Sequence, residues 1–560
     1  MKKRVLTALF AVSLAGLMVI AGCQTSGAKG GAMKPGTYNA QCNGYYGDFN
    51  VSVTVTANAI TTISAGDYKE TPAVGGKAIS ILIDRIIEAN TSGVDNVSGA
   101  TITSIAFKAA VTDCLQQAKA GPAFTAAPAK PEQKNVSVTT DVLVVGAGGA
   151  GFSAAIAAAE NGAKVTLIEK QDITGGSTVV SAGIVYAATD PADYAKMTDY
   201  YMARSEGKAD RTMLRFFAER SLDTIAFLES IWVKWMMTIP AGTAPEPRAR
   251  FSMHDDGTFM IGSSLIDPLE KKAKDMGVTI LTGVRGTELT LDAQGKISGA
   301  KAAAKGTNYT INTRAVILTT GGFDASEEMK AQYSPIAVKD FPISNKGNTG
   351  DGIKMGIAAG AETVFNGGVI GFQFINPALP ESGNNAAAIY SGLYVRPDGS
   401  FVAPPQDYPI LYTTLKKDGG EKYFGVHDSK SWQLDAAKKA VTQGFGWTAS
   451  TIEDLAKATG MDAAKLAAAF KNVPQLVNPP YIAVEVRACT IGSMGGLKTN
   501  TSAEVLKKGS TAAIPGLYAA GETANGSFYY QEYPASGTSN SLCVTFGREA
   551  GKNAAAYIRK

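Results

Sequence analysis

The residues whose types and spacing first indicate chemistry lie between Asp141 and Lys170, where closely spaced glycines precede one acid. The glycines would let the backbone turn tightly and approach a pyrophosphate, whose oxygens would accept from the N–H groups of the next helix. Glu169 would accept hydrogen bonds from a ribose. The glycines are Gly146, Gly148, Gly149 and Gly151. The alternative is a purely structural glycine-rich turn.

Two apolar runs predict the elements that hold these residues in place. Val142–Val145 and Val165–Ile168 predict buried parallel strands, and the Ala-rich segment between them predicts a helix. Strand, glycine turn, helix, second strand and terminal acid then follow in the order of a complete βαβ unit. This order favours dinucleotide binding over a structural turn, and it predicts an α/β, Rossmann-type domain.

More glycine-rich stretches identify the dinucleotide through a family resemblance. A second loop contains Gly175, Gly176, Ser177 and Gly183, and three distant stretches are AVILTTGGF (Ala315–Phe323), TGDGI (Thr349–Ile353) and IPGLYAAGE (Ile514–Glu522). Together they resemble the fumarate reductase and succinate dehydrogenase flavoprotein family, whose members bind FAD with them. The resemblance covers roughly residues 141–560. It implies non-covalent FAD, with Gly321, Gly322, Asp351, Gly521 and Glu522 added to the cofactor-binding residues above.

The segment Asp95–Ser104, DNVSGATITS, carries a second flavin motif. It resembles the FMN-binding domain in which a separate flavin transferase esterifies an SGAT threonine to the phosphate of FMN. The resemblance implies covalent FMN on Thr101. A phosphoester requires only a hydroxyl, Gly99 permits close approach, and the next helix N-terminus would face the phosphate. The alternative is that Ser98–Thr103 merely caps a helix predicted to start near Ile105.

The pattern of apolar residues predicts an α+β fold for the first domain. The predicted strands are Asn50–Ala57 and Ile60–Ile63, and the predicted helices are Ile79–Ala89 and Ile105–Ala118. The family resemblance implies a cap domain inserted into the FAD domain. The predicted boundaries are a signal peptide at 1–23, a tether at 24–35, an FMN-binding domain at 36–120, a linker at 121–140, an FAD-binding domain at 141–371 and 486–560, and an α+β cap at 372–485.

The N-terminus predicts export. Lys2, Lys3 and Arg4 precede an apolar segment that ends near Ile20, which is typical of a signal peptide. The small residues before Cys23 resemble a lipobox. They imply cleavage before Cys23, a lipid on its sulfur and an extracytoplasmic protein anchored to the cell membrane.

Charge and cysteine spacing exclude several other classes. The net charge is only +4, and no basic run follows the signal peptide, so no nucleic-acid partner is expected. The remaining cysteines are too far apart for CxxC or haem-attaching CxxCH motifs, and no metal site is predicted. They are Cys42, Cys114, Cys489 and Cys543. Pairing of Cys42 with Cys114 is left open.

The substrate positions depart from the fumarate reductase pattern, in which His, Arg and a Thr-Glu pair hold a dicarboxylate and a cap Arg protonates carbon. A desolvated dianion needs cationic partners, so fumarate is not the expected substrate. The matching positions hold Asn376 with Pro377, Asn384 with Asn385, Ile491 with Gly492, and Tyr408 in place of the acid Arg.

An aromatic cluster replaces these ligands. Tyr533 begins YPASG, which resembles the Tyr-Pro-x-x-Gly of 3-ketosteroid 1-dehydrogenases. The match implies that Tyr533 and the Gly537 N–H polarise a carbonyl, so that its β-carbon accepts hydride from FAD. Tyr408 would then protonate the α-carbon. The alternative for Tyr533, and for the neighbouring Phe528, Tyr529 and Tyr530, is packing.

These predictions combine into an exported reductase in which a membrane-side donor reduces FMN, FMN reduces FAD, and FAD reduces an activated C=C bond of a small molecule. Two alternatives remain: a dehydrogenase that runs the reverse reaction, and a flavin-carrying shuttle or binding lipoprotein without a substrate. The predicted cap argues against the second. Neither His254 nor His427 matches a catalytic position of the family, and neither is expected to be catalytic.

Overall fold

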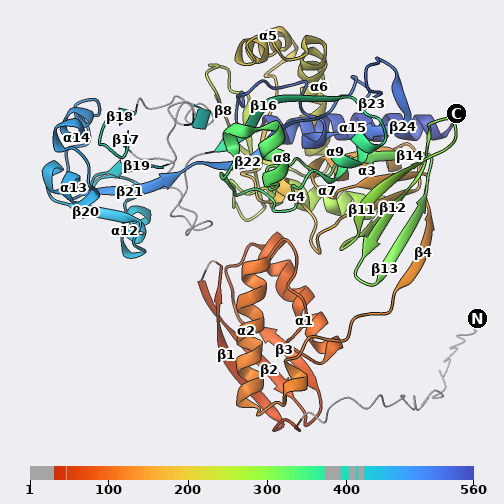
Figure 1. The fold of residues 1–560 in the computed structure, drawn as a ribbon, viewed down its shortest axis with the longest axis horizontal. Coiled ribbons are helices and arrows are strands. Elements are labelled where there is room, and N and C mark those ends of the chain that lie inside the picture. Colours follow the sequence, from red (N-terminus) through yellow and green to blue (C-terminus); the bar gives the residue numbers. More distant parts are fainter. Residues whose placement is uncertain (1–30, 46, 373–391, 403–411, 414–415, 417–421) are drawn as a thin grey trace, which may run out of the picture.

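The computed structural model of the chain describes residues 31–45, 47–372, 392–402, 412–413, 416 and 422–560. They form a small N-terminal domain, a central α/β domain and an outlying cap domain that strands connect to the centre (Figure 1). The predicted signal peptide, Cys23 and the first part of the tether lie outside the described residues. Within the described ranges, no helix combines the length and apolar composition needed to cross a membrane.

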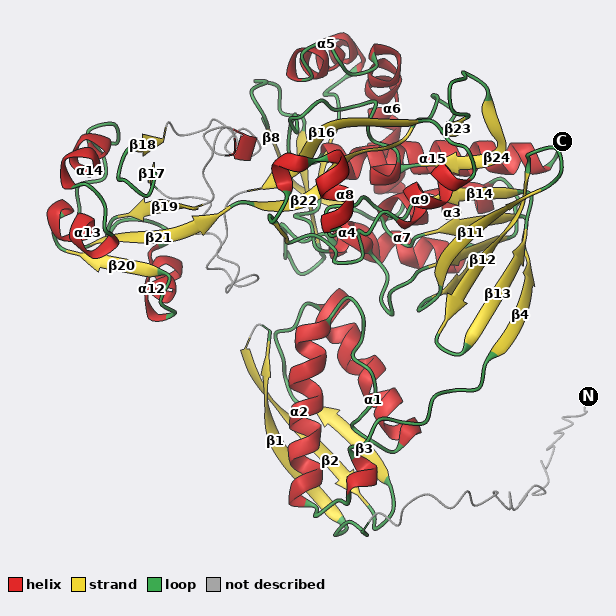
Figure 2. Ribbon diagram, viewed as in Figure 1, coloured by secondary structure: helices red, strands yellow, loops and turns green. Residues whose placement is uncertain are grey.

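The N-terminal domain is a three-stranded antiparallel sheet with two helices packed on it (Figure 2). Alternation along the second strand buries Val51, Val53 and Val55, as the pattern NVSVTVTA predicts. The elements are β1 (Gly36–Gly44), β2 (Gly47–Val55), β3 (Ile60–Ala65), α1 (Lys77–Ala89) and α2 (Thr101–Gln117). This is the predicted α+β domain.

Helix α2 begins at Thr101 rather than near Ile105. Packing of its buried face overrides the low helix propensity of its β-branched first residues. The capping role considered for Ser98–Thr103 is wrong, because Ala100 is the N-cap and no side-chain hydrogen bond caps the helix. Ser98 instead bonds to Asp172 of the central domain.

Cys42 and Cys114 are both buried free thiols, so the structure has no disulfide between them. Burial raises the pKa of Cys42 to about 12 and that of Cys114 to about 11. The Cys114 thiol donates to the Tyr38 carbonyl at 3.4 Å. Both cysteines therefore act as small core residues.

The central domain is built on a six-stranded sheet whose strands pair in the order β10-β6-β5-β14-β24-β23. Pairing is parallel except between β23 and β24. Every residue of Val142–Val145 is buried, as expected for a parallel strand covered on both faces. The strands are β5 (Val142–Val145), β6 (Val165–Ile168), β10 (Thr279–Leu281), β14 (Ala315–Leu318), β23 (Glu504–Leu506) and β24 (Ala513–Ala519).

Two helices that are far apart in sequence pack tightly beside this sheet, α3 (Gly149–Glu160) and α15 (Thr538–Ile558). Glycines on α15 make the approach possible. A Cβ at Gly547 would lie 2.5 Å from the Ala150 carbonyl oxygen, and one at Gly551 would lie 2.1 Å from that of Ala154. The C-terminal helix is therefore an integral part of the dinucleotide-binding unit.

A second, four-stranded sheet extends from the central domain in the order β11-β12-β13-β4. The predicted linker at 121–140 contributes to it, because Lys134–Thr139 forms β4 and pairs in parallel with β13. The loop between the domains is thus shorter than the linker that the sequence predicted. The other strands are β11 (Arg285–Leu291), β12 (Ile297–Ala304) and β13 (Thr307–Asn312).

Further helices and strands complete the described part of the central domain. The helices are α4 (Gly176–Val179), α5 (Tyr194–Arg204), α6 (Arg211–Ser230), α7 (Ser263–Asp275), α8 (Glu327–Tyr333) and α9 (Asp351–Ala358). The strands are β7 (Ile184–Tyr186), β8 (Lys234–Ile239), β9 (Ala249–Met253), β15 (Phe341–Pro342), β16 (Thr363–Phe372) and β22 (Cys489–Leu497).

In the described residues, the cap domain contains a five-stranded sheet, in the order β18-β17-β19-β21-β20, and the helices α12, α13 and α14, whose bounds follow. Its last strand continues to Arg487 and leads directly into β22 of the central domain. The cap strands are β17 (Leu393–Val395), β18 (Phe401–Val402), β19 (Lys422–His427), β20 (Gly446–Ala449) and β21 (Tyr481–Arg487), and the helices are α12 (Leu434–Thr442), α13 (Ile452–Thr459) and α14 (Ala463–Phe470).

Candidate active site

A cavity of about 390 Å³ lies where the glycine turn, the second glycine loop and the start of α15 meet. Its lining includes twelve of the residues selected from the sequence: Gly146, Gly148, Gly149, Glu169, Gly176, Ser177, Gly321, Asp351, Gly521, Glu522, Tyr533 and Gly537. No described residue between 392 and 487, in the cap, belongs to the lining. Motifs nearly 400 residues apart in the sequence therefore share one site.

The turn between β5 and α3 is shaped to receive an anion. Gly146 has a φ of 108°, and a Cβ at Gly151 would lie 1.8 Å from the Gly146 carbonyl oxygen, so the turn packs against its own helix. A Cβ at Gly148 would meet nothing closer than 3.8 Å. No side chain caps α3, and its first turn contains no acid. The free N–H groups of α3 are thus available to phosphate oxygens.

Glu169 supports that turn and also faces the cavity. Its Oε2 accepts the Ala147 N–H at 2.8 Å, and its Oε1 accepts the Gln171 N–H at 2.9 Å. Burial raises the pKa of this carboxyl group, and the two backbone N–H groups oppose that effect. Each oxygen retains a lone pair that a ribose hydroxyl could use.

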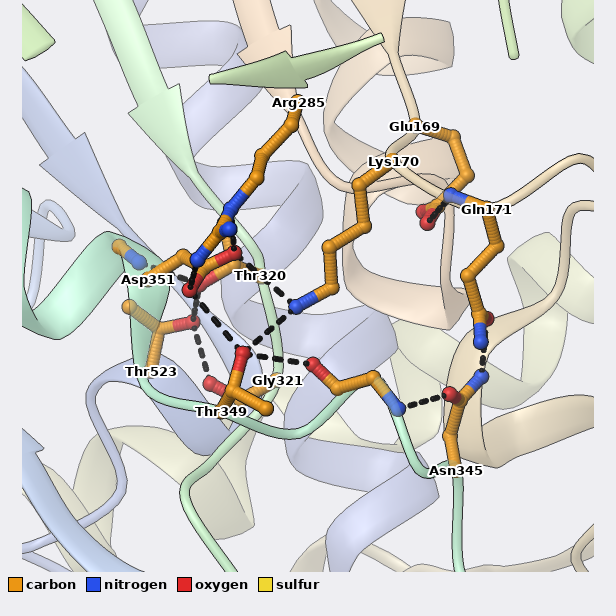
Figure 3. Close-up of polar contacts among 12 residues, drawn as sticks. Glu169, Lys170, Gln171, Arg285, Thr320, Gly321, Asn345, Thr349, Asp351 and Thr523 are labelled. Carbon is orange, nitrogen blue, oxygen red and sulfur yellow. Dashed lines mark hydrogen bonds and ion pairs between the residues drawn. The ribbon is translucent and has the colours of Figure 1, made fainter. Parts of the chain in front are cut away.

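Asp351 lines the same cavity as Glu169 and is already bonded to two cations (Figure 3). Arg285 donates to both of its oxygens, at 2.8 and 3.0 Å, and Lys170 donates to Oδ2 at 3.0 Å. Burial opposes ionisation, yet these partners lower the pKa of Asp351. Its role in the structure is to hold two cations at this end of the cavity, which are chemically suited to a pyrophosphate.

The second glycine loop is held in place by backbone geometry and by a side-chain hydrogen bond to Ser177. Gly175 has a φ of 118° and forms a bridge with Gly148, which brings the two glycine loops together. Ser177 Oγ accepts from the Asn348 side chain at 3.0 Å. Gly183, with a φ of 65°, packs against Ser252 behind the loop and is not part of the lining.

Gly321 and Glu522 line the cavity, and Gly322, which does not line it, packs against Glu522. A Cβ at Gly322 would lie 2.8 Å from Glu522 Oε2, so the pair cannot tolerate a larger residue. Glu522 Oε2 is buried without a hydrogen-bond partner. Burial first, and then the charge of Asp324, raises the pKa of Glu522 well above its usual value. Asp324 accepts from three side chains, those of Ser344, Asn348 and Thr490.

At the opposite end, Tyr533 and the N-terminus of α15 border the cavity. The Tyr533 hydroxyl oxygen accepts the Ser539 N–H at 2.8 Å. Gly537 is the N-cap of α15, with a φ of 89°, and no side chain caps this helix. The structure therefore brings Tyr533 and Gly537 together, as YPASG predicts, beside the positive end of a helix dipole.

The other aromatic residues pack behind Tyr533 and do not line the cavity. Phe528 packs on Phe217 and Phe546, and the Tyr529 ring lies edge-on to Tyr533 with a centroid distance of 5.7 Å. Packing is thus the better interpretation for Phe528 and Tyr529. Tyr408, Asn376, Pro377, Asn384 and Asn385 lie outside the described residues.

Neither histidine contributes to the cavity. The His254 ring bonds to Ser263 at 2.7 Å, and the His427 ring, which is buried in the cap, bonds to Ser431 at 2.9 Å. Cys543 lines the cavity, and burial raises the pKa of its thiol to about 12. A thiol held in the neutral form is a poor nucleophile.

Thr101 lies apart from the cavity, as the first residue of α2, and is exposed to solvent. The loop before it contacts the central domain directly: Ser98 bonds to Asp172, three residues after Glu169. Thr101, the residue predicted to carry FMN, is therefore accessible. The loop that precedes it lies against the segment that contains Asp172, which follows Glu169 in the chain.

Sequence reasoning missed several lining residues. Lys170 follows Glu169 directly, so its position at the site could have been inferred. Asn540 lies three residues after Gly537 of YPASG, so its position could also have been inferred. Arg285 comes from β11, which carries no glycine motif, and tertiary contacts bring it to the cavity. Two helix N-termini without side-chain caps, two glycine loops that lie against each other and a carboxylate placed to bind a ribose together fit a bound FAD.

The comparisons with known proteins agree with this fit. Residues 141–539 match the family of FAD-binding domains, and residues 44–116 match the FMN-binding domain. The chain belongs to the FAD-binding domain family. It is a flavin-dependent oxidoreductase, with an FMN-binding domain placed before its FAD-binding domain.

Two relatives of this family member span most of its length. A urocanate reductase of Eggerthella lenta is 29% identical, over 97% of each chain. A probable fumarate reductase of Shewanella frigidimarina is 30% identical, over 75% of this chain and 76% of the relative.

Solved structures share the fold. The open conformation of a flavocytochrome c3 fumarate reductase has a TM-score of 0.62 at 27% identity, over 76% of this chain and 79% of that one. A 3-ketosteroid Δ1-dehydrogenase from Sterolibacterium denitrificans has a TM-score of 0.67 at 19% identity, over 75% of this chain and 99% of that one. The predicted flavoprotein fold is confirmed, and so is its likeness to both groups.

Proposed function

We propose that this flavoprotein passes electrons from FMN on Thr101 to FAD, and that FAD reduces an activated C=C bond of an enone or enoate. One observation carries the proposal. The exposed hydroxyl of Thr101 lies just after a loop that contacts Asp172, close to the ribose-binding end of the FAD cavity. The two relatives, named as a urocanate reductase and a probable fumarate reductase, support reduction of a carbon–carbon double bond.

The chain's residues supply orientation and hydrogen bonding, while bound FAD would supply hydride chemistry. Tyr533 donates a hydrogen bond to the substrate carbonyl. The Ser539 N–H, which already bonds to the Tyr533 oxygen at 2.8 Å, favours negative charge on that oxygen and makes Tyr533 a stronger donor. The Gly537 N–H is the second donor to the carbonyl oxygen. Tyr408 protonates the α-carbon.

Charge around the cavity supports a substrate other than fumarate. The cationic residues of its described lining are Lys170 and Arg285, and both bond to Asp351 at the Glu169 end. The described lining at the Tyr533 end offers neutral donors. A monocarboxylate or a ketone loses less hydration energy there than a dianion does.

Export, membrane attachment and maturation belong to the same proposal. The signal-like N-terminus and Cys23 support a lipid-anchored protein outside the cytoplasm. NAD(P)H is unavailable there, so a membrane-side donor would reduce the FMN domain. A separate flavin transferase would attach FMN, because a phosphoester on Thr101 does not form by simple binding.

The test is the substitution Thr101→Ala. We expect mass spectrometry of protein made with the transferase to find one FMN adduct on the wild-type Thr101 peptide and none in the variant, while FAD content stays unchanged. Retention of the adduct by Thr101→Ala contradicts the attachment site. Anaerobic reoxidation of the reduced enzyme by a panel of enones, enoates and fumarate tests the substrate class, and fast reoxidation by fumarate contradicts it.

A further inference from the structure

The contact between the N-terminal and central domains is centred on one carboxylate. Asp172 Oδ2 accepts both the N–H and the hydroxyl of Ser98, at 2.8 and 2.9 Å, and the Asp172 N–H donates back to the Ser98 hydroxyl at 2.8 Å. Arg85 of α1 donates to Asp172 Oδ1 at 2.5 Å. We call these three residues the Asp172 clasp.

The clasp is better built than a chance surface contact. Asp172 is 19% exposed, and although burial opposes ionisation, the bonds from Arg85 and Ser98 lower its pKa. A carboxylate with this many charge-assisted donors holds one geometry. A second ion pair with low exposure on one side, Lys77 with Glu270, is 2.8 Å long and joins the same two domains.

Apolar packing continues the contact. Ile173, which follows Asp172, is 5% exposed and packs into the core of the N-terminal domain. Gly99 lies over it with a φ of 96°, and a Cβ there would lie 2.7 Å from Ile173 Cγ1. Ser98 and Gly99 of the SGAT sequence therefore meet the central domain, and Thr101, which follows, remains exposed.

The segment that the loop contacts also belongs to the FAD cavity. Gln171 lines the cavity and precedes Asp172 directly, and Glu169 lies two residues earlier. The segment continues from Ile173 to Gly176 and Ser177, which also line the cavity. Electron transfer slows steeply with distance, so a domain held against this segment keeps a flavin on Thr101 closer to the FAD than an undocked domain would. A flexible linker alone raises the effective concentration of one domain near the other, but it does not fix their relative orientation.

We propose that the Asp172 clasp is the docking device for electron transfer between the two flavins, and that Asp172 is a positioning residue for this step. The proposal rests on the proposed function, because it requires FMN on Thr101. Two electrons leave reduced FMN and two arrive on oxidised FAD, with the accompanying protons exchanged with water, so no further reactant is needed.

The experiment compares Asp172→Ala, Asp172→Asn and Arg85→Met with Asp95→Asn in FMN- and FAD-loaded protein. Asp95 is the matched control, since its pair with Lys305 spans the same domains but both side chains are more than half exposed. Hydrogen exchange of the peptide containing residues 95–104 reports docking. Stopped-flow reduction by reduced methyl viologen reports flavin reduction, and Thr101→Ala gives the rate at which FAD is reduced without FMN.

We expect Asp172→Ala to keep both flavins and to lose exchange protection at 95–104. It should slow FAD reduction by about tenfold or more toward the Thr101→Ala rate, because one hydrogen bond to a charged group is worth roughly a factor of ten and this variant removes the bonds from both Ser98 and Arg85. Asp172→Asn retains an acceptor for Ser98, so its exchange protection and its rate of FAD reduction should lie between those of Asp172→Ala and wild type. Arg85→Met should also lose exchange protection. Asp95→Asn should match wild type in both measurements.

Two outcomes contradict the docking role of the Asp172 clasp. One is unchanged hydrogen-exchange protection in Asp172→Ala, and the other is loss of that protection with an unchanged rate of FAD reduction. A different result separates the proposed function from the clasp. If wild type and Thr101→Ala reduce FAD at the same rate while wild type shows exchange protection that Asp172→Ala loses, the docking contact is real, and the relay from FMN to FAD is wrong.

Discussion

The two ends of the cavity are constructed differently. The central part of the Glu169 end comes from one short stretch of chain, in which the glycine turn, α3 and Glu169 all fall within residues 146–169. Arg285 of β11 and Asp351 of α9 join it from elsewhere in the sequence. Its polar groups are charged and paired, as in the bonds from Lys170 and Arg285 to Asp351. A binding function that one βαβ unit can supply is therefore encoded locally.

The Tyr533 end is assembled from residues that are distant in sequence. Tyr533 and α15 meet Ile184 of β7, Ile370 of β16 and Ile491 of β22. Its lining is mainly apolar and its donors are neutral. The comparison teaches that local backbone geometry binds the ribose and pyrophosphate of the cofactor, whereas the site of the reaction depends on tertiary packing. Substrate specificity can therefore change at the Tyr533 end without loss of FAD binding.

The strongest test of the local end separates two kinds of glycine. Gly151→Ala places a Cβ 1.8 Å from the Gly146 carbonyl oxygen, so the turn must move. We expect a loss of about 1–3 kcal/mol or more in the free energy of unfolding, together with loss of FAD. Thermal unfolding and FAD absorbance are the measurements.

Gly148→Ala is the matched variant, because its Cβ has free space in the protein and its φ of −87° suits alanine. We expect a normally folded protein with weakened FAD binding, since the methyl group occupies space that the pyrophosphate needs. If Gly148→Ala binds FAD as wild type does, the pyrophosphate does not cross this turn.

The local end could be predicted from sequence in detail. The strands at Val142–Val145 and Val165–Ile168 have the predicted bounds, and Glu169 faces the cavity. The partners of Asp351 could not be predicted, because Arg285 comes from β11, which carries no motif. The sequence likewise placed α2 too late and missed β4, since helix propensity and strand alternation do not report the tertiary contacts that extend both.

The Tyr533 end was predicted only in part. YPASG correctly brought Tyr533 and Gly537 to the cavity, but nothing local reveals that Ser539 would donate to the Tyr533 oxygen. The docking role of Asp172 could not be predicted either, because its partner Ser98 is 74 residues away and the sequence assigns Ser98 to the FMN-attachment motif, with helix capping as the alternative.

The next prediction tests the assembled end. Tyr533→Phe removes one donor to the substrate carbonyl, and we expect reoxidation of reduced FAD by an enone or enoate to slow by about 10²- to 10³-fold, with little change in FAD content. Tyr529→Phe is the control, since it removes a buried hydroxyl that has no partner and leaves the ring contact with Tyr533. Equal rates in both variants would make Tyr533 a packing residue.

A smaller effect is expected from the cations at the Glu169 end. Lys170→Met removes one of the two cations that face Asp351 but leaves the bidentate bond from Arg285. We expect the Kd for FAD to rise several-fold, corresponding to about 1 kcal/mol, because the ammonium is partly exposed. Fluorescence titration of apoprotein measures this, with Lys274→Met, on the surface of α7, as the control. Identical Kd values would mean that Lys170 contributes nothing to cofactor binding.

The smallest effect concerns the wall between the two ends, where Glu522 and Asp324 share buried surroundings. Asp324 has three side-chain donors, whereas Glu522 Oε2 has no partner, so the proton belongs on Glu522. A raised pKa in the folded state means that the stability contributed by this group is present below the usual pKa of about 4.3 and is lost as pH rises through the raised value.

Glu522→Gln keeps the shape of the neutral acid and removes its titration. We therefore expect the Tm of the FAD-loaded wild type to fall relative to that of Glu522→Gln between pH 5 and pH 8, by roughly 2 °C. Glu328→Gln, at an exposed position on α8, should follow wild type. A constant difference between wild type and Glu522→Gln across this range would show that Glu522 is not protonated in the folded protein, and that the charge in the wall belongs to it rather than to Asp324.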